Sequence, residues 1–464
     1  MDLEVGDNRS PWVSPLICIW PTPNLRADVI ASPQLQIAFQ TVCFIFWLLF
    51  TQKAQPNQRT DHLEKQFTKN RLIEQRQTSI KTTMTIKLAK DDELLQALAA
   101  SGGLKGHNLL MLLPSGFQPD AARLDELRAK YPGLQISVHE SAWGNTVVPE
   151  SVSGSGDGFG WEDVTILATG TALPTREQAP RLQYVQLISA GANHVLQNPL
   201  FDDESIALCT ANGVHGPQIS EWIISTFLSF EHHLPRYIEK QKEGKWDPSY
   251  DGVDDAVGRR VGVLGYGSIG RQVARLCKAL GMDVHAYTLH PRETPESRRD
   301  DAYAPPGTGD PNGEFPSRWF SGGSRADLHR FLSSGLDLLV VSAPLTDKTA
   351  HLLGADEFAL LGEGNGKGKT FLSNIARGKV VDTDALVAAL EGGVLRGAAL
   401  DVTDPEPLPE GHPLWRAKNV CITPHVSAAS SKLGPRILSI LDMNLGRFSQ
   451  RKPLANRVNR KEGY

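Results

Sequence analysis

The sequence contains few cysteines and none of the cysteine patterns that cross-link small secreted domains or bind metals. Among its 464 residues are 5 cysteines, and no two of them form a Cys-x-x-Cys pair. This usage fits a reducing compartment, and we expect the protein in the cytoplasm. The histidines lack the spaced cysteine, histidine or carboxylate companions that a zinc site needs, so we predict no metal.

The chain also lacks a strong excess of either charge. Lys and Arg number 48 and Asp and Glu number 52, which gives a formal net charge of −4. No basic stripe is interleaved with aromatic residues, so nucleic acid is not an expected partner. No repeat period is visible either, and the length allows two or three globular domains.

Long apolar runs are missing as well. The strongest run, Thr41–Phe50, is shorter than the roughly 20 residues of a membrane helix, although weaker residues could extend it to 35–50. No basic segment precedes it, which argues against a cleavable secretory signal. We interpret residues 1–83 as an N-terminal extension that is dispensable, a marginal membrane anchor or a docking segment.

From Met84 onward, short apolar runs alternate with helical or loop stretches, which is typical of an α/β domain with a parallel sheet. Five such runs precede residue 210, and a long helix is predicted from about Gln218 to Gly244. Loop composition marks Ser151–Gly160 as a surface excursion. A Pro/Gly-rich insertion, 291–325, is too long for an ordinary connection. It either covers a cofactor or forms a disordered surface loop.

A glycine-rich turn is the most informative motif that is present. Gly265, Gly267 and Gly270 follow the apolar run Val261–Leu264 at Gly-x-Gly-x-x-Gly spacing and precede an amphipathic helical pattern. The first glycine permits the tight turn, the second lets backbone N–H groups approach a pyrophosphate, and the third lets the helix pack on the strand. This pattern predicts a dinucleotide-binding turn.

Three polar residues stand just after predicted strands in the second half of the chain. They are Arg377, Glu406 and His425. Parallel sheets bind ligands at the carboxyl ends of their strands, so these side chains are candidates for one site. Each has an ordinary structural interpretation when taken alone, such as an ion pair, a solvated loop or a buried histidine.

Taken together, the motifs resemble the D-isomer-specific 2-hydroxyacid dehydrogenase family over essentially Met84–Tyr464. The similarity rests on the glycine turn, Ala343-Pro-Leu-Thr-Asp-Lys-Thr349, Asn374-x-Ala-Arg-Gly-x-x-Val-Asp382, the run from Leu400-Asp-Val to His-Pro-Leu-Trp415, and Thr-Pro-His425. The resemblance implies two Rossmann- or flavodoxin-like doubly wound domains. A cofactor domain, 216–427, would be inserted within a substrate domain formed by 84–215 and 428–464.

The resemblance also implies roles for individual residues. His425 would be the general acid/base, Glu406 its carboxylate partner and Arg377 the cation that binds substrate; a neighbouring carboxylate stabilises the imidazolium that must supply a proton. The substrate is expected to contact Ala190, Gly191, Ala192, Arg377 and His425. The residues expected at the cofactor are Gly265, Tyr266, Gly267, Ser268, Ile269, Gly270, Thr288, Arg292, Ala343, Pro344, Ile375, Ala376 and Asp401.

The expected cofactor preference follows from one position at which the chain departs from the NAD-binding pattern. An NAD-preferring turn expects an acidic residue at the end of the second strand, where this chain has Thr288. Arg292 stands downstream and could neutralise a 2′-phosphate, so we expect NADPH over NADH. The arrangement is similar to that of glyoxylate and hydroxypyruvate reductases, which favours reduction of a small 2-oxo acid. We also expect the protein to be a homodimer.

Two other functions compete with this prediction. The first is a nucleotide-sensing binding protein similar to the C-terminal-binding corepressors, which the three site residues do not distinguish from an enzyme. The second is a formate dehydrogenase-like enzyme. Glu406 argues against the second, because that branch has glutamine as the partner of the histidine.

Overall fold

The computed structural model describes residues 103–142, 144–150, 152, 159–248, 252–363 and 369–461. The N-terminal extension 1–83 with its apolar run, the predicted domain start at Met84 and most of the loop Ser151–Gly160 lie outside these residues. Within the described part of the chain, no helix is both long and apolar enough to cross a membrane.

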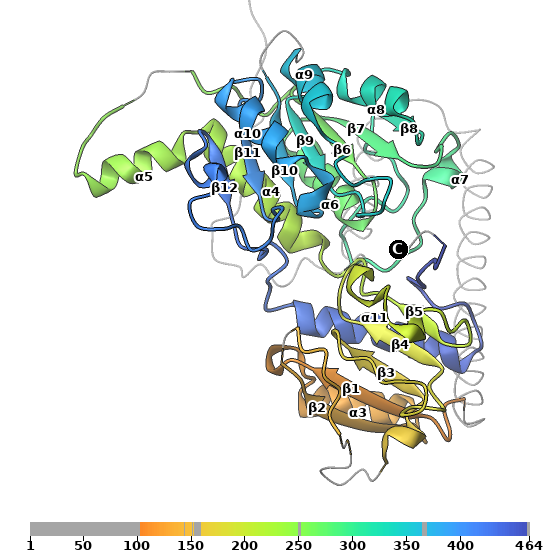
Figure 1. The fold of residues 1–464 in the computed structure, drawn as a ribbon. Coiled ribbons are helices and arrows are strands. Elements are labelled where there is room, and N and C mark those ends of the chain that lie inside the picture. Colours follow the sequence, from red (N-terminus) through yellow and green to blue (C-terminus); the bar gives the residue numbers. More distant parts are fainter. Residues whose placement is uncertain are drawn as a thin grey trace, which may run out of the picture. The chain divides into compact units, whose positions relative to one another are not determined.

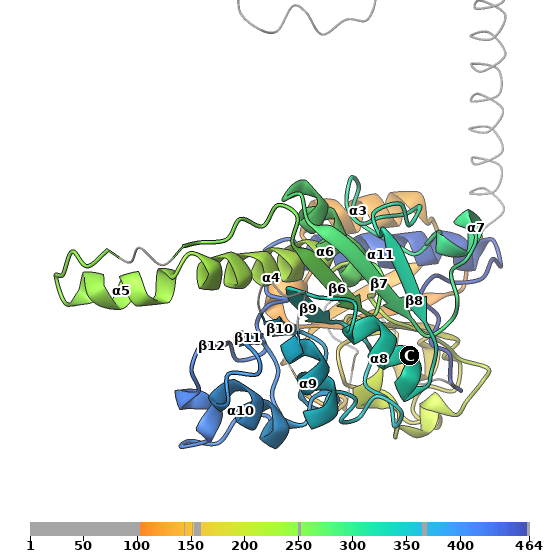
Figure 2. The same cartoon turned by 90° about the horizontal axis from the view of Figure 1, so that it is seen from above.

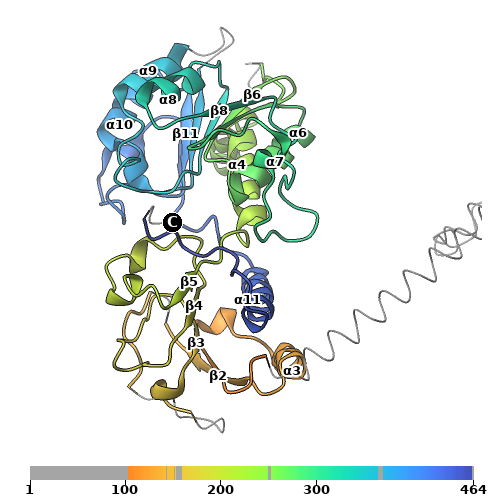
Figure 3. The same cartoon turned by 90° about the vertical axis from the view of Figure 1, so that its right-hand side faces the viewer.

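The first half of the described chain builds a parallel five-stranded sheet in the order β2-β1-β3-β4-β5, a flavodoxin-like order (Figure 1). Helices α3 and α11 contribute to one hydrophobic core on this sheet and lie on the same face (Figure 3). The elements are β1 (Asn108–Leu113), α3 (Ala121–Lys130), β2 (Gln135–Glu140), β3 (Ile166–Thr169), β4 (Tyr184–Leu187), β5 (Ala207–Cys209) and the C-terminal α11 (Leu433–Ser449).

A second parallel sheet has seven strands in the order β12-β11-β10-β9-β6-β7-β8. Helices α4 and α6 cover one face and α8, α9 and α10 the other (Figure 3). The elements are α4 (Gly216–Glu231), α5 (Leu234–Lys242), β6 (Arg260–Leu264), α6 (Ser268–Ala279), β7 (Asp283–Thr288), α7 (Pro295–Arg298), β8 (Arg318–Ser321), α8 (Arg325–Leu332), β9 (Leu338–Val341), α9 (Ala355–Glu363), β10 (Phe371–Asn374), α10 (Thr383–Glu391), β11 (Gly397–Leu400) and β12 (Val420–Ile422).

Both sheets are parallel throughout, and this explains why their strands were visible as apolar runs. Strands covered on both faces cannot alternate polar with apolar residues. All six residues of β1 and all four of β9 are buried. The predicted α/β class with two doubly wound sheets is confirmed, and the chain returns through α11 to the core of the first sheet.

Two predictions about local structure were wrong. The single helix from Gln218 to Gly244 is two helices, because His233 adopts a left-handed backbone (φ +54°) and Pro235 lies in the first turn of α5. Of the two alternatives for the insertion 291–325, the disordered loop is wrong, since the insertion contains α7 and the edge strand β8, and cover of a cofactor stays a prediction.

Helix α5 continues outward beyond α4, and the chain then returns toward β6 (Figure 2). We call residues 234–248, which comprise α5 and the segment after it, the α5 arm, and this arm exposes several apolar side chains. Leu234 is 47% exposed, Ile238 51% and Trp246 97%. Exposed apolar residues gathered on one segment commonly mark a protein–protein contact.

Candidate active site

The glycine turn has the geometry that its sequence predicts. Gly265 has φ +101°, and a Cβ atom there would lie 2.7 Å from the Ala343 backbone nitrogen. A Cβ on Gly270 would lie 2.5 Å from the Gly265 carbonyl oxygen. A Cβ on Gly267, in contrast, would meet nothing within 4 Å. The first N–H groups of α6 have no partner within the helix, so open space and free donors fit a pyrophosphate there.

The loop after β9 is held beside this turn by its own threonines. The Thr349 hydroxyl donates to the Pro344 carbonyl at 2.7 Å and accepts from the Thr346 N–H at 2.7 Å. Ala343 stands against Gly265. The run Ala343–Thr349 therefore forms a rigid wall next to the glycine turn.

The loop after β10 presents Arg377. The buried Asn374 side chain accepts from the Ala376 N–H at 3.1 Å and donates to the Arg377 carbonyl at 3.2 Å. A Cβ on Gly378 would collide with the Thr403 carbonyl group, so glycine is required where this loop meets the loop after β11. The spacing of the Asn-x-Ala-Arg-Gly motif thus fixes the backbone around Arg377.

The Arg377 guanidinium is largely withdrawn from water. Burial lowers the pKa of Arg377, and the Glu406 carboxylate opposes this change. One of its nitrogens donates to the Ala376 carbonyl at 2.6 Å. An arginine remains charged under these conditions, so the site holds a cation with little water around it.

His425 and Glu406 form a close pair. The distance from His425 Nδ1 to Glu406 Oε1 is 2.7 Å, and the two side chains are 44% and 40% exposed. They come from the segments that follow β12 and β11. A carboxylate bonded to one ring nitrogen fixes the orientation of the imidazole and leaves the other nitrogen for proton transfer.

Asp401 holds the segment that carries this histidine. Its buried carboxylate accepts hydrogen bonds from the Thr423 hydroxyl (2.5 Å), the Val426 N–H (2.9 Å), and the Ser427 N–H and hydroxyl. His425 itself has φ +55°, a conformation that a non-glycine residue adopts only when its surroundings impose it. A contact of Asp401 with a nicotinamide stays a prediction, while the observed partners of its carboxylate belong to the His425 segment.

The five-stranded sheet reaches the site through the loop after β4. A Cβ on Gly191 would lie 3.7 Å from an Arg377 guanidinium nitrogen. The Asn193 amide donates to the Leu345 carbonyl at 3.1 Å and so links this loop to the wall after β9. Ala190 and Gly191 are partly exposed here, and Ala192 is buried.

Asn193 and His194 directly follow the predicted substrate loop, and neither was among the residues predicted for the site. His194 Nε2 lies 3.1 Å from the Gly170 carbonyl. Burial lowers the pKa of His194, the bond to Gly170 opposes this, and the Arg377 charge lowers it further. Their position directly after Ala192, where the predicted loop ended, could have indicated that both belong to the same loop.

The residues expected near a 2′-phosphate are engaged by their own loop. The Thr288 hydroxyl donates to the His290 carbonyl at 2.8 Å, and Arg292 donates to the Ser297 carbonyl. Thr288 is partly exposed at the end of β7. The structure therefore places both near the end of β7, and their contact with a cofactor stays a prediction.

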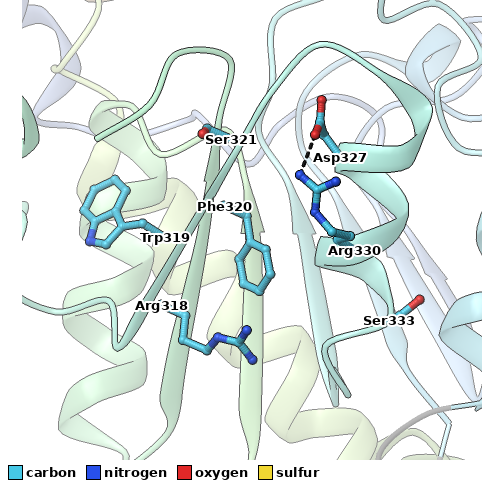
Figure 4. A pocket seen from close by; sticks show the side chains of 7 residues that line it. All are labelled: Arg318, Trp319, Phe320, Ser321, Asp327, Arg330 and Ser333. Carbon is cyan, nitrogen blue, oxygen red and sulfur yellow. Dashed lines mark hydrogen bonds and ion pairs between the residues drawn. The ribbon is translucent and has the colours of Figure 1, made fainter. Parts of the chain in front are cut away.

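A hollow of about 610 Å³ lies elsewhere, between the edge strand β8 and α8 (Figure 4). Arg330 pairs with Asp327 in it, and Arg318 stacks on Phe320. Its lining shares no residue with the predicted site. The residues that line it are Arg318, Trp319, Phe320, Ser321, Asp327, Arg330 and Ser333.

Comparison with known proteins agrees with this geometry. The model of the D-isomer specific 2-hydroxyacid dehydrogenase NAD binding domain matches residues 224–305 and 317–427. A glyoxylate reductase of Aeropyrum pernix is 35% identical over 299 residues, which cover 61% of this chain and 78% of the relative. A hydroxypyruvate reductase of Blautia hydrogenotrophica is 27% identical over 290 residues, covering 61% and 80%.

Solved structures show the same arrangement of elements. A D-isomer specific 2-hydroxyacid dehydrogenase from Xanthobacter autotrophicus Py2, solved in complex with NADPH and MES, superposes with a TM-score of 0.58 at 26% identity. The match covers 77% of this chain and 99% of that one.

Proposed function

Because the chain belongs to the D-isomer specific 2-hydroxyacid dehydrogenase family, we propose that it reduces small 2-oxo acids, such as glyoxylate or hydroxypyruvate, with NAD(P)H, and oxidises D-2-hydroxy acids in reverse. The observation that carries the proposal is the 2.7 Å pair of His425 and Glu406 in a site that also holds the largely buried Arg377. A permanent cation and a held imidazole suit an anionic substrate that must gain a proton.

Arg377 binds the substrate in this proposal. Its planar fork can bond a carboxylate and a neighbouring carbonyl oxygen, and each charged hydrogen bond contributes about 1.5–3 kcal/mol. The burial that lowers its pKa also strengthens its attraction for an anion. The backbone of Ala190–Ala192 would close the other side of the carboxylate.

His425 transfers the proton. A bound nicotinamide supplies the hydride, and the protein must then neutralise the charge that grows on the carbonyl oxygen. With Nδ1 bonded to Glu406, the proton leaves from Nε2 of the imidazolium. Glu406 keeps the ring in one orientation.

A direct assay tests this proposal. Purified protein is mixed with NADH or NADPH and a panel of 2-oxo acids, and loss of the reduced cofactor is followed. Turnover of glyoxylate or hydroxypyruvate is expected, with D-glycerate formed from the latter. Tight binding of NADH without turnover of any 2-oxo acid would instead support a nucleotide-sensing role.

The proposed cofactor is NADPH. Two observations support this. Thr288 occupies the position where an acidic residue would favour NADH, and the relative from Xanthobacter autotrophicus Py2 was crystallised with NADPH. A ratio of kcat/KM values for the two cofactors measures the preference. Thr288→Asp should shift it toward NADH, because a carboxylate would repel a 2′-phosphate, and a wild type that already prefers NADH would contradict the proposal.

The proposed assembly is a homodimer formed through the α5 arm. Support comes from the exposed Leu234, Ile238 and Trp246 on a segment that extends from the seven-stranded sheet (Figure 2). Sedimentation of the wild type should give the mass of a dimer. Ile238→Asp combined with Trp246→Ser should give a monomer, and a monomeric wild type contradicts the proposal.

A further inference from the structure

One segment of the predicted cofactor domain has no counterpart in the family model. The family model stops at residue 305 and resumes at 317, so 306–316 lie outside it. We call residues 299–317, between α7 and β8, the strap. The strap is built onto α6, the helix that begins at the glycine turn.

The strap grips α6 through buried polar contacts. Gln272 accepts from the Gly309 N–H at 2.6 Å, and Arg275 donates to the Gly309 carbonyl at 2.8 Å. Arg271, only 4% exposed, donates to the Asp310 carbonyl and lies 3.2 Å from the Asp300 carboxylate. These contacts lie within about one turn of α6, so residues 309–310 of the strap are fixed against one side of the helix.

Asp310 connects the strap to the glycine turn itself. Its carboxylate is 3% exposed and accepts from the Tyr266 hydroxyl at 2.7 Å. The same carboxylate accepts from the N–H groups of Glu314 (3.0 Å) and Phe315 (3.1 Å), which fix its direction. Tyr266 is the residue between Gly265 and Gly267, and it is itself buried.

The environment of Tyr266 shows that its side chain is held firmly. Its ring meets Trp319 edge to face, with 5.0 Å between centroids. Burial and the Asp310 carboxylate both raise the pKa of Tyr266, so its hydroxyl stays a donor. With the ring and hydroxyl both fixed, the Cα of Tyr266 has little freedom, and the peptide groups on either side inherit this order.

We propose that Asp310 is a positioning residue for the dinucleotide-binding turn, acting through the Tyr266 hydroxyl to preset the backbone N–H groups that bind the pyrophosphate. The inference rests on the proposed function, because it needs a bound dinucleotide. Preset donors bind more tightly, since less order has to be imposed on binding. The strap would thus raise cofactor affinity without touching the substrate.

The experiment measures the Kd of NADPH and of NADH by fluorescence titration of the full chain, for the wild type and four variants. Asp310→Ala and Tyr266→Phe each remove the bond and should weaken both cofactors by roughly tenfold. Asp310→Asn keeps an acceptor for the Tyr266 hydroxyl but turns its NH2 group toward the Glu314 N–H, so its affinity should lie between those of the wild type and Asp310→Ala. Asp301→Asn is the matched control, because Asp301 lies in the same strap and its side chain is 90% exposed.

Charge alone predicts the opposite result. Removing a carboxylate from the cofactor half favours an anionic dinucleotide, so weaker binding by Asp310→Ala points to lost positioning. The double variant Tyr266→Phe/Asp310→Ala should bind no more weakly than the poorer single variant, because both changes break one bond. At saturating cofactor, the control Asp301→Asn should keep the wild-type kcat and the wild-type KM for the 2-oxo acid.

The outcomes separate the inference from the proposed function. A wild type that binds neither dinucleotide overturns both. A wild type that binds while Asp310→Ala and Tyr266→Phe bind equally well overturns the positioning role alone. So does a rise in the KM for the 2-oxo acid with no change in cofactor Kd. Tyr266→Phe removes one hydroxyl only, so it keeps the test valid if Asp310→Ala does not fold.

Discussion

The two sheets contribute different kinds of groups to the predicted site. The seven-stranded sheet supplies the three side chains with predicted catalytic roles: Arg377 follows β10, Glu406 follows β11 and His425 follows β12. The five-stranded sheet supplies a loop of small and uncharged residues, Ser189–Asn193, after β4. In the proposed function, proton transfer and cofactor binding would therefore share the seven-stranded sheet, while the five-stranded sheet would shape the space for the substrate.

This division has a physical reason. Charged groups that act together must be held within a fraction of an ångström, and neighbouring strands of one sheet do this best. The His425 segment illustrates this, because the Asp401 carboxylate accepts hydrogen bonds from three of its residues and so fixes its backbone. A loop that only encloses a substrate tolerates more change.

The largest expected effect is on the proton donor. His425→Gln should lower kcat by roughly 10²–10⁴-fold, because glutamine cannot supply a proton to the carbonyl oxygen. Cofactor Kd should stay near the wild-type value, since the residue acts on the substrate. Steady-state kinetics with a cofactor titration check both numbers, and undiminished turnover would contradict the role of the histidine.

A smaller effect is expected at the substrate cation. Arg377→Lys keeps the charge but loses the planar fork, so the KM for a 2-oxo acid should rise roughly 10–100-fold. The same variant should leave cofactor affinity unchanged. An unchanged KM would mean that the five-stranded sheet, and not Arg377, holds the substrate carboxylate.

Much of this arrangement is visible in the sequence. The strands of both sheets are apolar runs because they are buried on both faces, and the glycine turn is a short local pattern. The edge strand β8 was missed because Arg318–Ser321 is short, begins with a charged residue and follows a Pro/Gly-rich stretch. The helix break at His233 had a signal in the sequence, because Pro235 is unfavourable inside a helix and favourable in a first turn, whereas His232 and His233 are not helix breakers by type.

The site shows the same limit at longer range. That Arg377, Glu406 and His425 come after strands can be deduced locally. That Asp401 is committed to the His425 segment depends on bonds between residues 22–26 positions apart, and these follow only from the packing of β11 against β12. The bond from Asp310 to Tyr266 spans 44 positions and lies partly in a segment without a family pattern.

The stability of the seven-stranded sheet should depend on pH through a buried histidine. Burial, with help from the Arg260 charge, lowers the pKa of His285 on β7 from 6.5 to about 4. Between about pH 4 and pH 6.5, His285 therefore binds a proton in the unfolded chain but not in the folded chain. Stability is complete above about pH 6.5 and falls as the pH drops toward 4, by about 1–3 kcal/mol from this residue.

Urea denaturation at several pH values measures this loss. The slope should be reduced in His285→Gln, which cannot take up the proton. His215, whose pKa burial also lowers to about 4, should account for part of the remaining slope. A variant with the wild-type pH dependence would show that His285 is not the group responsible.

The smallest effect is expected where the five-stranded sheet meets Arg377. In Gly191→Ala the added Cβ would lie 3.4 Å from Asn193 Oδ1 and 3.7 Å from the Arg377 guanidinium, which are ordinary contacts. Stability should be unchanged, and the KM for glyoxylate should change by less than about threefold, with a larger rise for bulkier 2-oxo acids. Gly378→Ala is the matched variant on the other sheet, because its Cβ would collide with the Thr403 backbone and displace Arg377. If Gly191→Ala damages glyoxylate reduction as severely as Gly378→Ala, the five-stranded sheet is as tightly constrained as its partner, and the proposed division between them is wrong.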